Sequence, residues 1–484
     1  MVIFQPSWIN QGNRGFELTI LYIDVLFWMR QKKWLLIALA YGAIMHYGVT
    51  PPPDLNPAAF DALIIISIAL ILIITEPLPL PAIAMFMLFM QVILGIDTAN
   101  NVASSFMNDA VFFIMGSLML AVAIVSQGLD KRLALAIITM TGNKTWRIIA
   151  GFTAISALLA SFIGEHTVAA MMMPVGLTLV RYAHKDPKKV VGLTAALLFS
   201  IAYGATIGSI GTPSGGGRNV IMMNYWAEFG AGSVTYLEWI KYVYPMVLFQ
   251  IPFTVLILLW TFKPEQKTLD SAVRKLVIDV ARAGKIKGRE WLAIFLFFLV
   301  FLGWVFLSEA FGLGIIALLG VFLYLSFGLV EWQELNRKTN WGVILLFGAA
   351  ISIGIQMNET GAAEWVAQVI IVNLGKIIVD PAMLQGSVSV LLTGFMSNIL
   401  SSSATVAVVG PIVLDLGGDK ILMGYATAIA SAFGYFTAVA APACTIIYSS
   451  GLVRSKDFLR AGWKMGVLSL VSLLGLSLLW WPIL

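Results

Sequence analysis

Residues 160–174, ASFIGEHTVAAMMMP, place Glu165, His166 and Thr167 in the middle of an apolar stretch. Ionisable side chains at membrane depth are costly, and in membrane proteins they usually line a solute or ion pathway. A second stretch, residues 397–411 (SNILSSSATVAVVGP), has the same layout, with hydroxyl residues followed by an apolar run that ends in proline. We therefore expect the two stretches to be the tips of two half-membrane hairpins that meet around a solute.

The composition of the whole chain is typical of a polytopic membrane protein. Of its 484 residues, 59% are hydrophobic and only 11% are charged, whereas a soluble protein carries about a quarter charged residues. Apolar runs of about 17–25 residues recur, the length that a membrane-spanning helix needs. The formal charge of +5 lies in the loops, so it indicates topology and not nucleic-acid binding. Cys444 is the only cysteine, which excludes disulfides within the chain and any multi-cysteine metal site.

Basic residues predict the sidedness, because lysine and arginine in short loops are retained in the cytoplasm. They place residues 1–33 inside as a cytoplasmic lead-in, in which no cleavable signal peptide is recognisable. The first half is expected at residues 34–262 and the second at 291–484, joined by a basic cytoplasmic connector at 263–290. The basic loop at 454–464 is expected inside, which puts the C-terminus outside. The chain is thus expected to be a multi-pass protein of the cell (inner) membrane, in contact with lipid.

The first hairpin is expected at residues 148–180, because basic residues flank this segment on both sides and keep both ends in the cytoplasm. A segment that enters and leaves on one side is a re-entrant hairpin, and its polar tip is tolerated where protein buries it. Two short full spans are the alternative, but so short a segment leaves little room for an outer loop. The second hairpin, at 384–414, has few basic flanks and is expected to enter from outside.

A helix broken in mid-membrane is expected after each hairpin, at residues 192–225 and 421–450. The first is too long for one plain crossing, and its middle, residues 208–219, is rich in helix breakers, as in the unwound helices beside transporter binding sites. The halves also match locally, since residues 111–116 (VFFIMG) resemble residues 343–348 (VILLFG). Two similar halves of opposite sidedness form an inverted repeat, which is typical of secondary transporters. The predicted fold class is therefore all-α and polytopic, with two inverted repeats that each hold a re-entrant hairpin and a broken helix.

The chain after about residue 60 resembles the divalent anion/sodium symporter (DASS) family of the ion-transporter superfamily. That family carries a Ser-Asn-Thr-Ala-Thr-Ala-Ala…Pro signature at each hairpin tip, which aligns with residues 164–174 and 401–411. Its broken helices end near Gly-Thr-Pro-Pro-Asn, which aligns with residues 215–219 (GGGRN) and 440–444 (AAPAC). The resemblance implies an elevator-type transporter fold, a homodimer and a small anionic solute, with a di- or tricarboxylate as the expected class.

The residues of the site depart from the family signature. In the family, the signature asparagines help to hold sodium, while hydroxyl groups and tip amides bind substrate carboxylates. Here Glu165 aligns with the first asparagine, His166 with the first threonine and Ser402 with the second asparagine. A carboxylate beside a bound anion needs a compensating proton or cation, and Arg218, which aligns with a family proline, is the candidate cation. Glu165 and His166 are also candidates for proton coupling.

The residues expected to bind the solute lie at the two tips and at the two helix breaks. They are Gly164, Glu165, His166, Thr167, Gly215, Gly216, Arg218, Asn219, Ser401, Ser402, Ser403, Thr405, Ala441 and Pro442. No cofactor is expected except sodium, for which the candidate ligands are Glu165, Gly211, Ser397, Asn398 and Ser402. An equal alternative for Glu165 and Arg218 is a structural salt bridge that locks the two broken elements together, since intramembrane ion pairs serve both purposes.

Two hypotheses of function follow. The first is a secondary active transporter of a small anion, in which proton coupling or exchange is favoured over the family's two-sodium scheme. The second is a DASS-like scaffold whose transport site is disabled or repurposed, and which acts as a subunit of a larger membrane complex. No nucleophile–base constellation or cofactor motif in the sequence indicates an enzyme.

Overall fold

The computed structural model describes residues 32–128, 140–184, 186, 189–281, 287–374, 376, 380–437 and 441–484. In these residues the regular structure is helical, without β-strands. Seven of the described helices are long and apolar enough to cross a membrane, or up to eight if the bent pair α5–α6 forms one span. The chain is therefore a multi-pass membrane protein, as its composition predicts. Nearly all of the expected lead-in, residues 1–33, lies outside the described residues.

The helices of the first half lead from the N-terminal spans through the first hairpin to the connector. They are α2 (Lys33–Gly48), α3 (Pro57–Thr75), α4 (Leu80–Ile93), α5 (Ala99–Phe106), α6 (Asp109–Val125), α8 (Thr145–Ile163), α9 (Glu165–Ala183), α10 (Val191–Gly208), the short η2 (Pro213–Gly215), α11 (Gly217–Glu228), α12 (Tyr236–Phe262) and α13 (Asp270–Ala281). Helix α5 lies in a polar segment in which the sequence predicts no helix.

The remaining helices lie in residues 287–484. They are α14 (Gly288–Phe311), α15 (Leu313–Ser326), α16 (Trp332–Lys338), α17 (Trp341–Glu359), α18 (Ala362–Leu374), α19 (Pro381–Ser387), η3 (Val388–Leu392), α20 (Thr393–Met396), α21 (Ser402–Leu414), α22 (Lys420–Ala430), α23 (Pro442–Ser449), α24 (Ser455–Gly475), η4 (Leu476–Trp480) and η5 (Trp481–Ile483). The basic segment 454–464, expected to be a loop, is helical from Ser455 onward, so its basic residues lie in the first turns of α24.

Close packing of small residues holds α10 against α8. A Cβ atom at Gly208 would overlap the backbone of Ala157, and one at Gly204 would lie 2.6 Å from the carbonyl oxygen of Thr153. In a bilayer, helices associate largely through such close backbone approach, because lipid tails are as apolar as the side chains. Helix α10 is accordingly buried along its length, and it fixes the first hairpin from behind.

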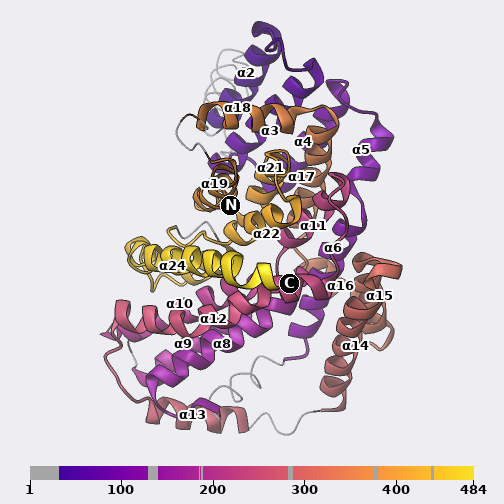
Figure 1. Ribbon diagram of the computed structural model, residues 1–484. Helices are drawn as coiled ribbons and strands as arrows, with labels where there is room; N and C mark the ends of the chain where they lie inside the picture. The colour runs from indigo at the N-terminus through magenta and orange to yellow at the C-terminus, as the bar shows by residue number, and fades with distance from the viewer. Residues whose placement is uncertain are drawn as a thin grey trace, which may run out of the picture.

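Helices of the first half pack against helices of the second half (Figure 1). Helix α4 packs on α17, and α6 packs on α15. Helix α11, which completes the first broken helix, packs on α21 of the second hairpin, whereas α23, which completes the second, packs on α9 of the first hairpin. Each hairpin therefore contacts the broken helix of the other half, and this crossing brings the two tips together.

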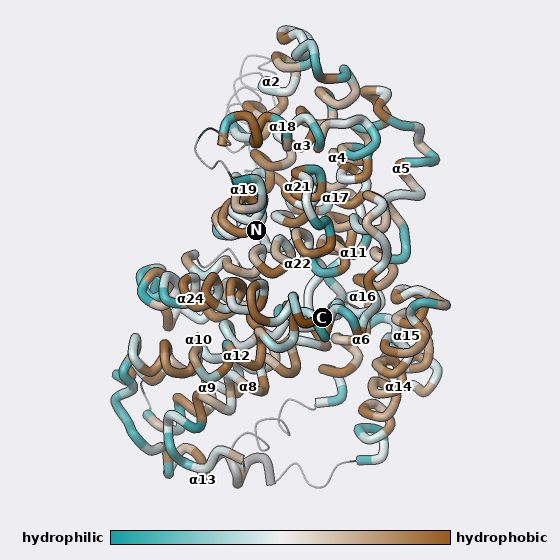
Figure 2. Tube along the Cα trace, in the orientation of Figure 1, coloured by the Kyte–Doolittle hydropathy of each residue, from teal (hydrophilic) through white to brown (hydrophobic). Residues whose placement is uncertain are grey.

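The outer surface is apolar where α14 and α15 face away from the rest of the chain. Figure 2 shows these two helices brown, the hydrophobic colour, over most of their length. Phe295, Phe298 and Phe306 of α14 and Phe322 of α15 are exposed. A bilayer would cover side chains of this kind, whereas water would leave a large apolar patch exposed. This surface agrees with a membrane location.

Candidate functional site

A cavity of about 390 Å³ lies where the two hairpin tips approach each other. Its wall contains residues 164–167 of the first tip, 401–403 of the second, 213–218 between α10 and α11, and Pro442 at the start of α23. Helices α9, α11, α21 and α23 thus all begin at the cavity. The N-terminus of a helix carries partial positive charge and unpaired N–H groups. Four such ends around one cavity favour an anion.

The cavity wall contains most of the residues that the sequence predicts to bind the solute. They are Gly164, Glu165, His166, Thr167, Gly215, Gly216, Arg218, Ser401, Ser402, Ser403 and Pro442. Three others lie behind the wall. The Asn219 side chain donates to the carbonyls of Ser209 (2.9 Å) and Thr212 (2.7 Å) and braces the helix break. Thr405 donates to a carbonyl of its own hairpin tip, and Ala441 is fully buried.

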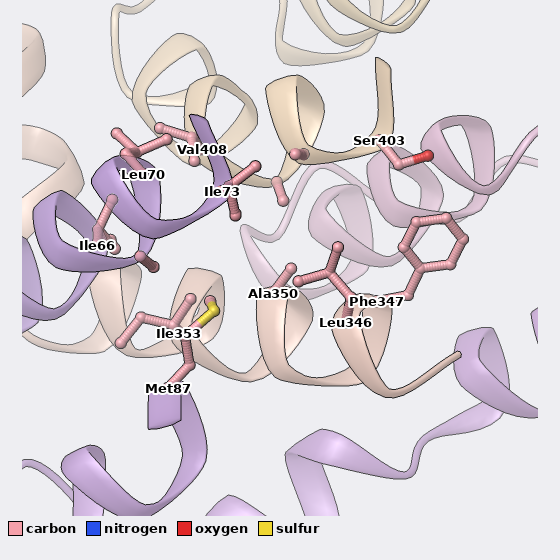
Figure 3. A pocket seen from close by; sticks show the side chains of 13 residues that line it. Ile66, Leu70, Ile73, Met87, Leu346, Phe347, Ala350, Ile353, Ser403 and Val408 are labelled. Atoms are coloured by element: carbon pink, nitrogen blue, oxygen red, sulfur yellow. The ribbon is translucent and has the colours of Figure 1, made fainter. Parts of the chain in front are cut away.

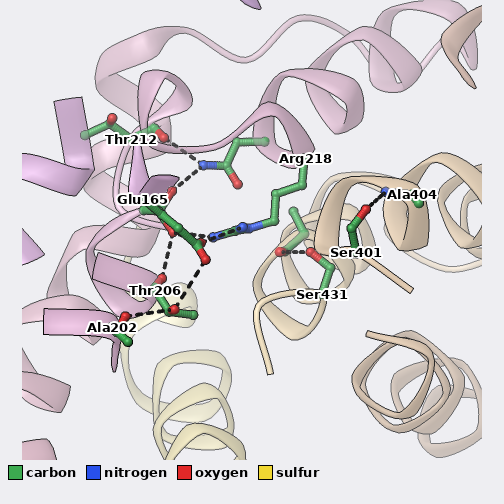
Figure 4. A network of polar contacts seen from close by, with 11 residues as sticks. Glu165, Ala202, Thr206, Thr212, Arg218, Ser401, Ala404 and Ser431 are labelled. Carbon is green, nitrogen blue, oxygen red and sulfur yellow. Dashed lines mark hydrogen bonds and ion pairs between the residues drawn. The ribbon is translucent and has the colours of Figure 1, made fainter. Parts of the chain in front are cut away.

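The first tip holds a buried ion pair, drawn in Figure 4. Arg218 Nη1 lies 3.6 Å from Glu165 Oε2, and the two side chains are only 3% and 5% exposed. Arg218 Nη2 donates to Ser209 Oγ at 2.6 Å, and this hydroxyl lies 3.1 Å from the same carboxylate oxygen. Thr206 Oγ1 lies 3.4 Å from Glu165 Oε1. The carboxylate is thus compensated inside the protein by a guanidinium that reaches it from α11.

The second tip has no ionised side chain among its cavity-lining residues. Ser401 caps α21, since its hydroxyl accepts from the Ala404 amide at 3.4 Å. Ser402 Oγ is buried and has no hydrogen-bond partner in the described part of the chain; the same holds for Ser117 Oγ and Arg218 Nε, which also belong to residues of the cavity wall. A buried polar atom without a partner costs about 1–3 kcal/mol. A ligand that reached these atoms would recover part of that cost.

Three of the candidate sodium ligands, Glu165, Ser397 and Asn398, already have partners inside the protein. Around Glu165, the positive charge is already supplied by Arg218. Asn398 Oδ1 accepts from the Phe436 amide at 2.9 Å, and Ser397 Oγ donates to the Gly394 carbonyl at 2.9 Å. Gly211 packs against Tyr244, outside the cavity wall. Among the described residues, no group of three or more His, Cys, Asp or Glu side chains is arranged to hold a metal ion.

The apolar part of the cavity wall comes from helices that the sequence analysis did not assign to the site. Helix α6 contributes Phe113, Ile114, Ser117 and Leu118, and α17 contributes Val343, Leu346 and Phe347, with Leu80, Thr445 and Ile446 completing that side. A signal for them exists in the sequence. The matching stretches 111–116 and 343–348 include Phe113 and Ile114 of α6 and the cavity-lining residues of α17, so the local sequence match falls on segments that line the cavity.

Comparison with known proteins gives consistent results. The family described as "Sodium:sulfate symporter transmembrane region" matches residues 30–484. The sodium-dependent dicarboxylate transporter SdcS of Staphylococcus saprophyticus is 25% identical over 404 residues, which cover 76% of each chain. The sodium-dependent high-affinity dicarboxylate transporter 3 of Caenorhabditis elegans is 25% identical over 436 residues, covering 78% of this chain and 75% of the relative.

A solved structure shows a similar fold. The YdaH transporter of Alcanivorax borkumensis aligns with a TM-score of 0.51 at 14% identity, covering 78% of this chain and 86% of that chain. At this identity the likeness concerns the fold alone. The helices described above are thus arranged similarly to those of a known membrane transporter.

Proposed function

The chain belongs to the sodium:sulfate symporter family, and from this premise we propose that it is a secondary active transporter of a small anion. The observation that carries the proposal is the cavity between the two hairpin tips, at which four helices begin. Helix N-termini attract anions, and the only ionised pair in the described cavity wall is neutral overall. The names of relatives make dicarboxylates the first class of solute to assay.

We propose that the solute is carried by an elevator mechanism in a homodimer. The exchange of partners between the halves, α4 with α17 and α6 with α15, supports an inverted repeat of residues 34–262 and 291–484. The hairpins and broken helices would form the moving unit, with the first hairpin opening from the cytoplasm and the second from outside. The N-terminus would then be cytoplasmic and the C-terminus outside.

An apolar crevice supports the sliding of the second hairpin. This crevice, of about 20 Å³, lies between α21 and the group of α3, α4 and α17. In Figure 3 Ile66, Ile73, Leu346 and Ile353 line it opposite Val408. Side chains of this kind form no hydrogen bonds. The Tyr225 hydroxyl, however, lies 3.1 Å from the Ala350 carbonyl of α17 and 3.0 Å from the Ala407 carbonyl of α21, so a displacement at this surface would break one of these two contacts. Ala350 and Ala407 line this crevice but not the cavity between the tips, and their carbonyls contact the same Tyr225 hydroxyl. Mercury cross-linking of cysteines placed at these two positions, in a Cys444→Ala chain, should arrest turnover if the two faces move relative to each other.

We propose that coupling is to a proton or to a second anion in exchange, and not to a sodium ion at the first tip. The carboxylate of Glu165 is the candidate proton site, together with His166 beside it, whereas Arg218 already provides the cation that sodium would supply. Relatives are described as sodium-dependent, so sodium remains an outcome that the assay must be able to detect.

Uptake by the purified chain in liposomes tests the proposed function. Labelled succinate, sulfate and hexanoate are supplied with and without imposed sodium and pH gradients, and with unlabelled anion inside the vesicles. We expect saturable uptake that a pH gradient or internal anion stimulates at constant sodium. Strict sodium dependence at constant pH would contradict the proposed coupling, and absence of saturable uptake under every gradient would contradict transport itself.

The alternative of a repurposed scaffold is not favoured, because the relatives named above are transporters and the chain keeps a cavity between its tips. Transporters are not enzymes, so the family also agrees with the prediction that the chain does not catalyse a reaction. Subunits that co-purify at fixed stoichiometry, without uptake by the chain alone, would support the alternative.

A further inference from the structure

We propose that the cavity selects an anion with a single oxyanion head and an apolar body, and that it disfavours a second carboxylate. The inference rests on the proposed function and narrows its class of solute. It departs from the di- or tricarboxylate that the family resemblance implies, for reasons that lie in the charges and the lining of this cavity.

The first reason is the charge of the cavity wall. Among the described residues that line it, the ionisable side chains are Glu165, Arg218 and His166. The first two form an ion pair, with Nη1 and Oε2 3.6 Å apart. A dicarboxylate that bridged the two tips would place its second negative charge near residues 164–167, beside a carboxylate. Like charges at short range in a poorly hydrated site repel strongly, so the first tip is unsuited to a second carboxylate.

The second reason is that polar atoms able to bind one head are concentrated at the second tip. Helix α21 begins at Ser402, and its first N–H groups and partial positive charge favour an oxyanion. Ser402 is only 3% exposed, and its hydroxyl is buried without a hydrogen-bond partner in the described chain. The first N–H groups of α21 and the Ser402 hydroxyl can donate to one carboxylate, sulfonate or sulfate group.

The third reason is the apolar wall that lies beside this head position. Phe113 and Leu118 of α6 and Leu346 and Phe347 of α17 line the cavity. The apolar crevice in Figure 3 shares Leu346, Phe347 and Ser403 with it, so the apolar surface continues from the second tip along α17. A hydrocarbon chain against such a wall is stabilised by about 25 cal/mol per Å² that it removes from water, whereas a carboxylate there would lose hydration without a partner.

A matched pair of ligands tests the inference directly. Hexanoate and adipate have the same six-carbon chain and differ by one carboxylate. Their binding to the purified wild-type chain in detergent is measured by isothermal titration at pH 8, where both acids are ionised, with hexanesulfonate as a second single-headed probe. We expect hexanoate and hexanesulfonate to bind at least about tenfold more tightly than adipate, a factor that corresponds to about 1.4 kcal/mol.

Substitution in the buried Glu165–Arg218 pair tests independently whether its carboxylate causes the preference for a single-headed anion. Glu165→Gln removes the negative charge and leaves Arg218 free to attract a second carboxylate, so the preference for hexanoate over adipate should fall by about tenfold or reverse. Asp457→Asn is the matched control. Asp457 is a buried carboxylate beside an arginine, Arg454, at 3.4 Å, but it lies outside the cavity wall. Its substitution should leave the ratio unchanged.

The outcomes separate this inference from the proposed function. Adipate or succinate that binds as tightly as hexanoate, or more tightly, overturns the inference and leaves anion transport intact. If hexanoate, hexanesulfonate, adipate and succinate all fail to bind or to be transported, the proposed function and the inference are overturned together. Because Glu165→Gln can lower stability, the wild-type ratio of hexanoate to adipate decides even if that variant does not fold.

Discussion

The two hairpin tips occupy corresponding positions on opposite sides of one cavity, yet they differ in charge. Glu165 opens α9 and Ser402 opens α21. The glutamate is engaged by Arg218 and lies close to two hydroxyls, whereas the serine hydroxyl has no partner in the described chain. The first tip thus compensates its carboxylate inside the protein, whereas the second tip leaves the Ser402 hydroxyl without a partner in the described chain.

Behind the tips, the two hairpins are anchored in equivalent places by different chemistry. Ser161 Oγ donates to the Gly208 carbonyl at 2.9 Å, at the break of the first broken helix. Asn398, at the same spacing before its tip, donates to the Phe433 carbonyl at 3.1 Å and accepts from the Phe436 amide at 2.9 Å. Each hairpin is thus tied to the break of its own broken helix, so a comparison of the two sides can be made residue by residue.

The largest loss of stability is expected from a substitution at the first tip. Arg218→Gln leaves the Glu165 carboxylate buried without a cation, and removal of one partner of a buried pair destabilises by about 3–5 kcal/mol. The free energy of unfolding is measured by titration with SDS in mixed micelles. The double variant Glu165→Gln/Arg218→Gln should recover most of the loss. A single variant as stable as the wild type would show that the pair does not hold the tip.

The anchors should differ in strength. Asn398→Ala removes the two hydrogen bonds to the second break and leaves its backbone groups without these partners, which should lower the free energy of unfolding by about 2–3 kcal/mol. Ser161→Ala removes one such bond and should cost about 1 kcal/mol. Equal losses in the same unfolding assay would mean that the two anchors are equivalent after all.

Adding one methyl group behind each tip, by a Gly→Ala substitution, compares how tightly the helices pack there. A Cβ at Gly208 would overlap the backbone of Ala157, whereas the nearest atom to a Cβ at Gly394 is 3.5 Å away, on Phe433. Gly208→Ala should therefore cost about 2 kcal/mol through overpacking. Gly394→Ala, in a helix with space for it, should be neutral or stabilising by up to about 1 kcal/mol. Thermal unfolding of both variants in detergent measures the difference, and a neutral Gly208→Ala would contradict the close approach of α8 and α10.

The smallest effect on stability, but a specific one on binding, is expected at the second tip. Ser402→Ala removes a hydroxyl without a partner, so the free energy of unfolding should stay within about 0.5 kcal/mol of the wild type. Anion affinity should fall by a factor of about 5–10, as for one hydrogen bond. Titration with hexanesulfonate measures it. Unchanged affinity would remove Ser402 from the site.

The sequence predicts the membrane class and the positions of most site residues because these depend on local patterns. Polar residues in an apolar run locate the tips, and glycine-rich stretches locate the helix breaks, as at residues 208–219. The hydroxyl partners of Glu165 at the end of α10, Thr206 and the following Ser209, could not be predicted, because their positions depend on the contact between Gly208 and Ala157. Nor could the apolar wall of α6 and α17, since periodicity alone does not say which face of a buried helix meets a cavity.

The difference between the tips is tested most directly by an experimental map of the protein with hexanesulfonate bound. We predict that the sulfonate lies within hydrogen-bond distance of Ser402 at the start of α21, with the hydrocarbon chain along Phe347 and the Glu165–Arg218 pair intact. A sulfonate bound instead at residues 164–167, with Arg218 turned away from Glu165 to meet it, would contradict the account.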